Sequence, residues 1–273
     1  MALEFYKRRF RMPSKKMQYS LAFTALLLVL AAVIGWMLIR HKLSLIGNED
    51  DVSDPSSSTI TAEQYSADDE AHLLVILTDE SITRFILIHT DPANAAITVT
   101  AIPNNAAISE GQSLSALYQK TGGARAVSAV ASALNVPVRH YMAISADNTE
   151  KWCGRLENEL TVTLTSPLSY PIADGTLSQL TVGEHTLNAV QTASLLSYTG
   201  TPDHAAANIV ATMLRQYLRT ERDLSSDFSF LSNITQTSLR IGDFNDYRGA
   251  LAHLAEKNTD GQCSISATTV SIS

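Results

Sequence analysis

The stretch "HLLVILTDESITRFILIHTDPANAAITVTAI", residues 72–102, decides the fold. Residues 72–78 and 84–90 are continuous apolar runs of strand length, the pattern of strands that are buried on both faces of a sheet. The turn-forming residues "DPANAA" separate the second run from a third strand at 97–102, so we expect a hairpin there. The stretch therefore predicts the centre of a sheet that is covered on both sides.

Helical and strand patterns interleave after this stretch. Apolar residues at helical spacing predict helices within 113–119, 123–135, 188–198, 204–220 and 243–257, and strands are expected at 136–144 and 159–164. The tail at 263–273 should be a strand or a loose end. This order predicts an α/β fold of α-β-α layers, with a mixed central β-sheet flanked by helices.

Residues 17–39 form a run of 23 residues without a charge, long enough to cross about 30 Å of hydrocarbon as a helix. Lys and Arg residues are concentrated before this run, which favours a cytoplasmic N-terminus. A cleaved signal peptide is the alternative, but its apolar region is shorter and ends at small residues. We therefore expect a retained single transmembrane helix.

The sequence predicts four parts: a basic cytoplasmic tail (1–16), a transmembrane helix (17–39), a flexible acidic and Ser-rich linker (40–70) and an extracytoplasmic domain (71–273). Residues 43–273 carry 12 Lys and Arg against 26 Asp and Glu. Phosphate contacts need a basic face, so this charge excludes nucleic acid as a partner.

General catalytic motifs are absent from the sequence. It contains no Gly-x-x-x-x-Gly-Lys phosphate loop, no Gly-x-Gly-x-x-Gly, no His-Glu-x-x-His and no Gly-x-Ser-x-Gly. The seven histidines have no metal-ligand spacing. Cys153 and Cys263 match no zinc pattern, and both a disulfide and two buried thiols are compatible with their spacing.

Several segments follow one another in a recognisable order. Two apolar strands, an Asp-Pro turn and a strand ending in Ile-Pro come first, and "GARAVSAVASALNVPVRHYMAIS", "LTVGEHTLNAVQTASLLSY" and "FLSNITQTSL" follow. In this order the chain resembles the LytR–CpsA–Psr (LCP) family of bacterial cell-envelope proteins, over about residues 15–255. The resemblance implies transfer of glycopolymers from a polyprenyl-pyrophosphate carrier to peptidoglycan, with a divalent cation.

That activity needs guanidinium groups for the pyrophosphate, carboxylates for a cation such as Mg²⁺, and an apolar groove for the lipid. This chain departs from the family at the charged positions. The family's Arg and Asp residues, and one Thr beside them, fall on uncharged residues here: Thr83, Asn104, Asn105, Ala106, Ser197, Thr199, Ala206 and Ile209. Each lost guanidinium removes charge-assisted contacts worth about 1.5–3 kcal/mol.

Five residues remain as candidate ligand-binding residues: Asp79, Arg84, Asn104, Asn105 and Arg215. Asp79 is also the candidate metal ligand, and Asp203 is a second acid that the alignment with the family pattern retains. Each candidate also has a structural interpretation. Asp79 could cap a loop, Arg84 could pair with Asp79 or Glu80, and Arg215 with Arg219 could form a solvated helix face. The two asparagines suit a turn after Pro103 on propensity alone.

We therefore expect a membrane-anchored, extracytoplasmic LCP-like protein of the cell envelope, as a catalytically degenerate binding or regulatory module in cell-wall glycopolymer assembly. A sensor of envelope state on the same fold is not distinguished from this. The alternative is an active phosphotransferase that uses Mg²⁺ and attaches polyprenyl-pyrophosphate-linked glycopolymers to peptidoglycan. It would require Asp79, Arg84, Asn104 and Arg215 to converge on one pocket.

The expected partners are the membrane, a polyprenyl-linked glycopolymer or peptidoglycan, and other envelope proteins. No cofactor is assigned to the binding module, and Mg²⁺ is expected if the protein is active. The expected location is the cell membrane, with the N-terminus in the cytoplasm and the C-terminal domain outside the cell.

Overall fold

The computed structural model describes residues 65–66, 69–79, 82–109, 111–155, 159–172, 175–219 and 224–270. The chain divides into two compact units, Met1–Thr61 and Ala62–Ser273, and all described residues belong to the second. The predicted tail (1–16), the predicted membrane helix (17–39) and most of the predicted linker lie outside the described residues. No helix among the described residues is long and apolar enough to cross a membrane.

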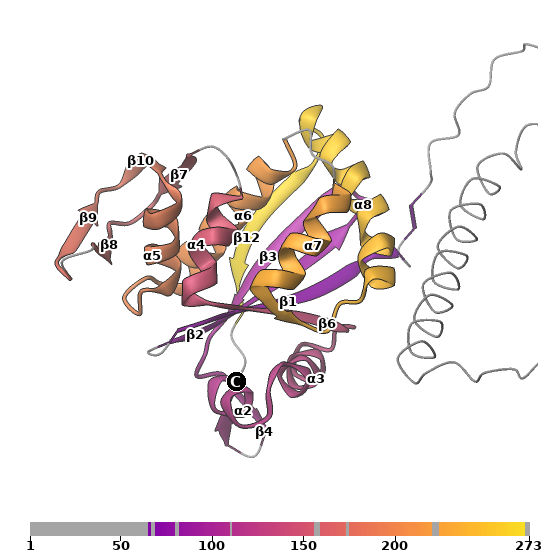
Figure 1. Cartoon of the computed structure of the whole chain (residues 1–273), viewed down its shortest axis with the longest axis horizontal. Helices are drawn as coiled ribbons and strands as arrows, with labels where there is room; N and C mark the ends of the chain where they lie inside the picture. The colour runs from indigo at the N-terminus through magenta and orange to yellow at the C-terminus, as the bar shows by residue number, and fades with distance from the viewer. Residues whose placement is uncertain are drawn as a thin grey trace, which may run out of the picture. The chain divides into compact units, whose positions relative to one another are not determined.

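A six-stranded mixed sheet forms the centre of the domain, in the order β11-β6-β1-β2-β3-β12 (Figure 1). The strand β1 is antiparallel to β2 and parallel to β6, while β3 is antiparallel to β2 and parallel to β12. The strands are β1 (Ala71–Thr78), β2 (Thr83–Asp91), β3 (Ala96–Ile102), β6 (His140–Ser145), β11 (Thr235–Thr237) and β12 (Ser264–Thr269). The predicted β2–β3 hairpin is confirmed, and the C-terminal tail contributes a strand.

Both faces of this sheet are buried. Leu74 and Ile76 of β1 lie in one hydrophobic cluster, whereas Val75 and Leu77 lie in another. Successive side chains of a strand point to opposite faces, so these clusters are the two cores on either side of the sheet. This two-sided burial explains why the sequence of β1 and β2 is continuously apolar rather than alternating.

Helices cover the two faces, as predicted for α-β-α layers (Figure 1). One face is covered by α2 (Leu114–Thr121) and α3 (Gly123–Leu134). The other face carries α4 (Ala146–Gly154), α5 (Ala189–Ser197), α6 (Asp203–Tyr217), α7 (Leu224–Ile234) and α8 (Ile241–Thr259). Asn188 begins α5 with a capping box, in which its side chain accepts from the backbone N–H of Gln191 and the Gln191 side chain accepts in return.

Three small antiparallel pairs complete the described elements: β4 (Ala107–Ser109) with β5 (Gln112–Ser113), β7 (Leu160–Leu164) with β10 (Gly183–Leu187), and β8 (Leu168–Pro171) with β9 (Leu177–Leu180). The sequence analysis missed α4, α7, β4, β5, β8, β9 and β11. The predicted strand at 136–144 was wrong in its first half, because β6 begins only at His140. Pro137 lacks the N–H that a sheet ladder needs, and Val138 instead donates to the carbonyl of Val136.

Cys153 and Cys263 are free thiols, so the structure contains two unpaired cysteines and not the disulfide. Cys153 is buried on α4, and burial raises the pKa of its thiol to about 12. The thiolate is the reactive form of cysteine, so Cys153 is a packed and unreactive residue.

Candidate functional site

An apolar cavity of about 170 Å³ lies between the sheet and the helices of the α4–α8 face. Its walls come from β1, β2 and β6 on the sheet side and from α4, α6, α7 and α8 on the helix side. The lining residues are mostly large and apolar: Leu73, Ile88, Met142, Trp152, Met213, Leu214, Phe230, Leu231, Leu239, Phe244 and Leu251, with Ala71, Thr90, Arg155, Tyr217 and Tyr247. Apolar cavities of similar size bind apolar ligands, so this space is suited to a segment of hydrocarbon chain.

The register of the sheet fixes the place of the cavity. Ala71 pairs with Thr90 and Leu73 pairs with Ile88 across the β1–β2 ladder, at the end of the sheet where β1 begins. Met142 of β6 extends this floor to the next strand. The flexible Met142 and Met213 side chains fill irregular space and adapt to a ligand more easily than branched residues do.

Arg155 is the one charged side chain among the described residues that line this cavity. It follows α4 directly, and its guanidinium carbon lies 5.1 Å from the ring centroid of Phe230 on α7. A guanidinium over an aromatic face is a cation–π contact, worth about 0.5–1 kcal/mol at partly exposed sites. This contact joins α4 to α7 across the cavity wall.

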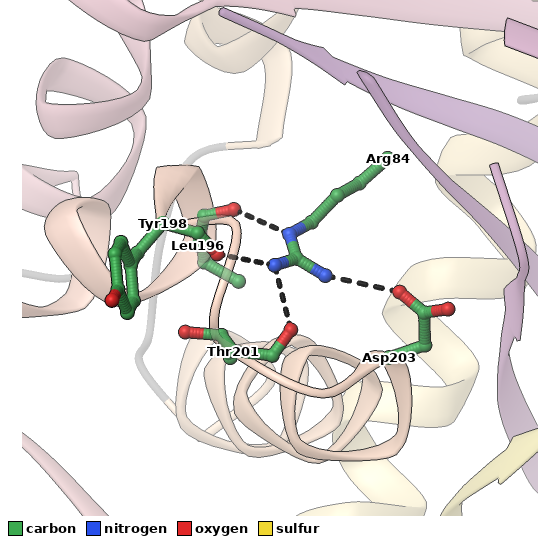
Figure 2. Close-up of polar contacts among 5 residues, drawn as sticks. All are labelled: Arg84, Leu196, Tyr198, Thr201 and Asp203. Carbon is green, nitrogen blue, oxygen red and sulfur yellow. Dashed lines mark hydrogen bonds and ion pairs between the residues drawn. The ribbon is translucent and has the colours of Figure 1, made fainter. Parts of the chain in front are cut away.

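Arg84 lies near the opposite end of β1, where Leu77 is its partner in the ladder. Only 3% of Arg84 is exposed, and its guanidinium makes four hydrogen bonds with the α5–α6 connection (Figure 2). Nε donates to the carbonyl of Leu196 at 2.8 Å, and one terminal nitrogen donates to the carbonyls of Tyr198 and Thr201 at 2.5 and 2.7 Å. The other terminal nitrogen lies 3.0 Å from the carboxylate of Asp203.

These contacts make Arg84 a structural residue. Burial lowers the pKa of Arg84 and the charge of Asp203 opposes that shift, and the strongly basic guanidinium stays protonated. The charge therefore needs the acceptors that the α5–α6 connection supplies. The ion pair that the structure shows is with Asp203, from the start of α6, rather than with the neighbouring acids that the sequence suggested.

Asp79, Asn104 and Asn105 lie at the same end of the sheet as Arg84. The N–H of Asp79 donates to the carbonyl of Ile82 at 2.8 Å in the β1–β2 connection. Pro103 to Ala106 form a turn, closed by the 3.0 Å bond from the N–H of Ala106 to the carbonyl of Pro103. The carbonyl of Asn104 accepts from the N–H of Ser115, which ties this turn to α2, and Asn105 is exposed.

Arg215 does not join this group. Its guanidinium donates to the carbonyl of Ile265 at 2.6 Å, and Ile265 pairs with Ile97 near the beginning of β3. Asn104 follows the other end of that strand, and Arg215 is twelve residues along α6 from Asp203, a rise of about 18 Å. The structure therefore brings Asp79, Arg84 and the two asparagines to one edge and leaves Arg215 elsewhere.

A divalent-metal site finds little support in the described residues. They contain no group of three or more His, Cys, Asp or Glu side chains that could hold a metal ion. At the Arg84 edge, the carboxylate of Asp203 is engaged with the guanidinium. The residues there do not fit the Mg²⁺ site that the family resemblance implies, and the assignment of Asp79 as a metal ligand stays a prediction.

Comparison with solved structures identifies the fold. A protein from Eubacterium siraeum described as a transcription regulator superposes with a TM-score of 0.65 at 17% identity, over 81% of this chain and 89% of its own. TagV of B. subtilis superposes with a TM-score of 0.57 at 13% identity, over 74% of this chain and 84% of TagV. TagT bound to LIIa-WTA superposes with a TM-score of 0.54 at 15% identity, over 81% of this chain and 87% of TagT. TagV and TagT are LCP proteins.

The chain has the LCP fold. No family model and no curated protein matches its sequence. The order of weak motifs that suggested the family was therefore a better guide to this LCP fold than any single motif. At these identities the comparison establishes architecture alone.

Sequence reasoning missed the residues that form the cavity of this LCP fold. Trp152 belongs to α4, Arg155 follows α4 directly, and Phe230 belongs to α7, and neither of these helices was predicted. The cluster of aromatic residues at 228, 230, 244 and 247 was an available signal, since aromatic side chains in adjacent helices often pack on one another. Phe228 and Phe244 do so, with ring centroids 5.3 Å apart.

Proposed function

We propose that this protein is a membrane-anchored, extracytoplasmic LCP-like module of the bacterial cell envelope that binds a polyprenyl-linked glycopolymer and does not transfer it. The apolar cavity would receive part of the polyprenyl chain. The uncharged run at 17–39 would anchor the domain at the membrane, and the excess of positive charge before it would keep the N-terminus in the cytoplasm. A regulatory role would follow from binding the carrier without consuming it.

The observation that carries this proposal is the inward direction of the Arg84 guanidinium. Arg84 lies one residue after Thr83, where the family pattern has an Asp, and its hydrogen bonds go to three carbonyls and one carboxylate. Transfer from a pyrophosphate needs guanidinium donors that are aimed at the substrate. Arg84 is aimed at the α5–α6 connection, and Asn104 and Asn105 carry no charge.

The resemblance to TagT supports a glycopolymer as the ligand class, because TagT has been solved with LIIa-WTA bound. The apolar cavity supports binding through the hydrocarbon part of such a ligand. Hydrophobic burial and phosphate recognition rest on different residues, so one can persist without the other.

The test is a titration of the full chain with a polyprenyl pyrophosphate, with and without Mg²⁺, while phosphate release is monitored. We expect binding that is insensitive to Mg²⁺ and no phosphate release. A Leu251→Trp variant, which narrows the cavity, should bind more weakly. Val190→Trp, on the exposed side of α5, is the matched control and should bind normally. Phosphate release that depends on Mg²⁺ would instead establish the phosphotransferase, and absence of binding would refute the carrier-binding role.

A further inference from the structure

A second, polar pocket of about 330 Å³ lies at the beginning of β1. It is formed by the segment before β1, by the residues before β6 and by α8. Ala71 and Tyr247 line both this polar pocket and the apolar cavity. The two spaces therefore adjoin, and together they offer an apolar compartment and a polar compartment to one ligand.

The polar pocket carries an excess of negative charge. Asp69, Glu70 and Asp243 line it together with a single guanidinium, that of Arg139. A pocket lined by one sign of charge raises the local concentration of the opposite ion. Its charge therefore favours a cation and disfavours a phosphate.

Each of the three carboxylates uses one oxygen inside the protein. Oδ2 of Asp69 accepts from the N–H of Ser66 at 2.8 Å, and Oδ2 of Asp243 accepts from the N–H of Arg240 at 2.8 Å. Oε2 of Glu70 lies 3.0 Å from Nε2 of His89. These contacts fix the carboxylates in place and engage one of the two oxygens of each, which keeps acceptor capacity at the pocket wall.

A buried histidine gives an independent indication of a ligand. His72 lines the polar pocket and is 7% exposed, and its Nδ1 has no hydrogen-bond partner among the described residues. His140 also lines the pocket, and its Nδ1 is likewise buried without a hydrogen-bond partner among the described residues. A buried polar atom without a partner costs about 1–3 kcal/mol, so such an atom in a pocket wall is usually satisfied by an ordered water or a bound group.

We propose that the two adjoining spaces bind a single-chain amphiphile with a primary ammonium head group. The hydrocarbon chain lies in the apolar cavity, and the ammonium lies in the polar pocket, where its N–H groups donate to the carboxylates. This site lies at the opposite end of β1 from Arg84 and does not require the carrier binding proposed above.

The test compares three probes with the same chain and different heads: octylammonium, octyl glucoside and octyl sulfate. The sequence has two tryptophans, Trp36 and Trp152, and Trp152 lines the apolar cavity. In a Trp36→Phe full chain held in phosphatidylcholine vesicles, fluorescence therefore reports on the cavity. Protein-free vesicles correct for partitioning of the probes. We expect half-saturation with octylammonium at a concentration about tenfold below that of octyl sulfate, with octyl glucoside between them.

A charge-neutralised variant assigns the preference to the pocket. The Asp69→Asn, Glu70→Gln double variant should lose most of the tenfold preference and still bind octyl glucoside, while Glu184→Gln, on exposed β10, should keep the preference. Circular dichroism checks that each variant is folded. Equal binding of all three heads would overturn this inference and leave the carrier-binding proposal standing. Absence of binding by every probe would overturn it as well, and a preference that survives neutralisation would place the head group elsewhere.

Discussion

The two ends of strand β1 use polar residues in opposite ways. At the end next to Arg84, a buried cation is matched by three carbonyls and a carboxylate of the same chain (Figure 2). At the Ala71 end, an apolar cavity adjoins an acidic pocket in which buried imidazole nitrogens have no partner among the described residues. One end is filled by the protein's own contacts, whereas the other offers space and acceptors.

This difference shows that an arginine at a strand end does not by itself indicate a ligand site. What matters is where the hydrogen-bond acceptors come from. At Arg84 they are main-chain carbonyls of the α5–α6 connection, so the charge stabilises the fold. A ligand site instead leaves acceptors or donors for a partner outside the chain.

The largest expected effect is on stability at the Arg84 end. Arg84→Met removes the donors of the Leu196, Tyr198 and Thr201 carbonyls and the ion pair with the partly exposed Asp203. Each carbonyl left without a donor costs about 1–3 kcal/mol, so we expect a loss of about 3–5 kcal/mol in total. Urea unfolding measures the loss. Arg219→Met, on an exposed residue, should change stability by less than about 0.5 kcal/mol. A loss below about 1 kcal/mol for Arg84→Met would show that water can replace the guanidinium there.

A smaller effect is the difference in lost stability between truncating a residue of the filled core and truncating a residue that lines the open cavity. Phe85 is 1% exposed and packs on Tyr118 in the core under α2 and α3, so Phe85→Ala should cost about 3–5 kcal/mol. Phe244 lines the apolar cavity and has fewer atoms opposite it, so Phe244→Ala should cost about 1 kcal/mol less. Urea unfolding of both variants gives the comparison, and equal losses would mean that the cavity is closed in solution.

The smallest effect is a dependence of stability on pH at the Ala71 end. Burial lowers the pKa of His72, the nearby His89 adds to this, and Glu70 opposes it. As the pH falls, His72 is therefore protonated at a higher pH in the unfolded chain than in the folded protein. The contribution of His72 is fully present above the ordinary histidine pKa of about 6.5 and declines as the pH falls below it.

Urea midpoints at about pH 7.5 and about pH 5.5 measure this dependence. His72→Gln should weaken the dependence, and His204→Gln, an exposed histidine at the start of α6, should leave it unchanged. If the His72→Gln variant keeps the full pH dependence, another group is responsible for it. That result would also show that His72 is more hydrated than its burial indicates.

The sequence by itself determined the layered architecture. The apolar runs that became β1 and β2 are too continuous for a surface strand, and the stripe of Ala126, Val127 and Val130 specified the buried face of α3. These are local patterns with a fixed period, so they can be recognised without knowledge of the partner. The turn at Pro103 likewise follows from the chemistry of the residues that form it.

Tertiary structure alone decided which polar residues are structural and which border open space. The partners of Arg84 are more than one hundred residues away in sequence. Nothing in the sequence distinguishes Asp203 from the other acids as the partner of Arg84, because only the position of α6 in the fold brings the two side chains together. The cavity depends on α4 and α7, two helices that the sequence did not lead us to predict. Hydrogen bonds and cavities are relations between distant segments, and no local pattern encodes them.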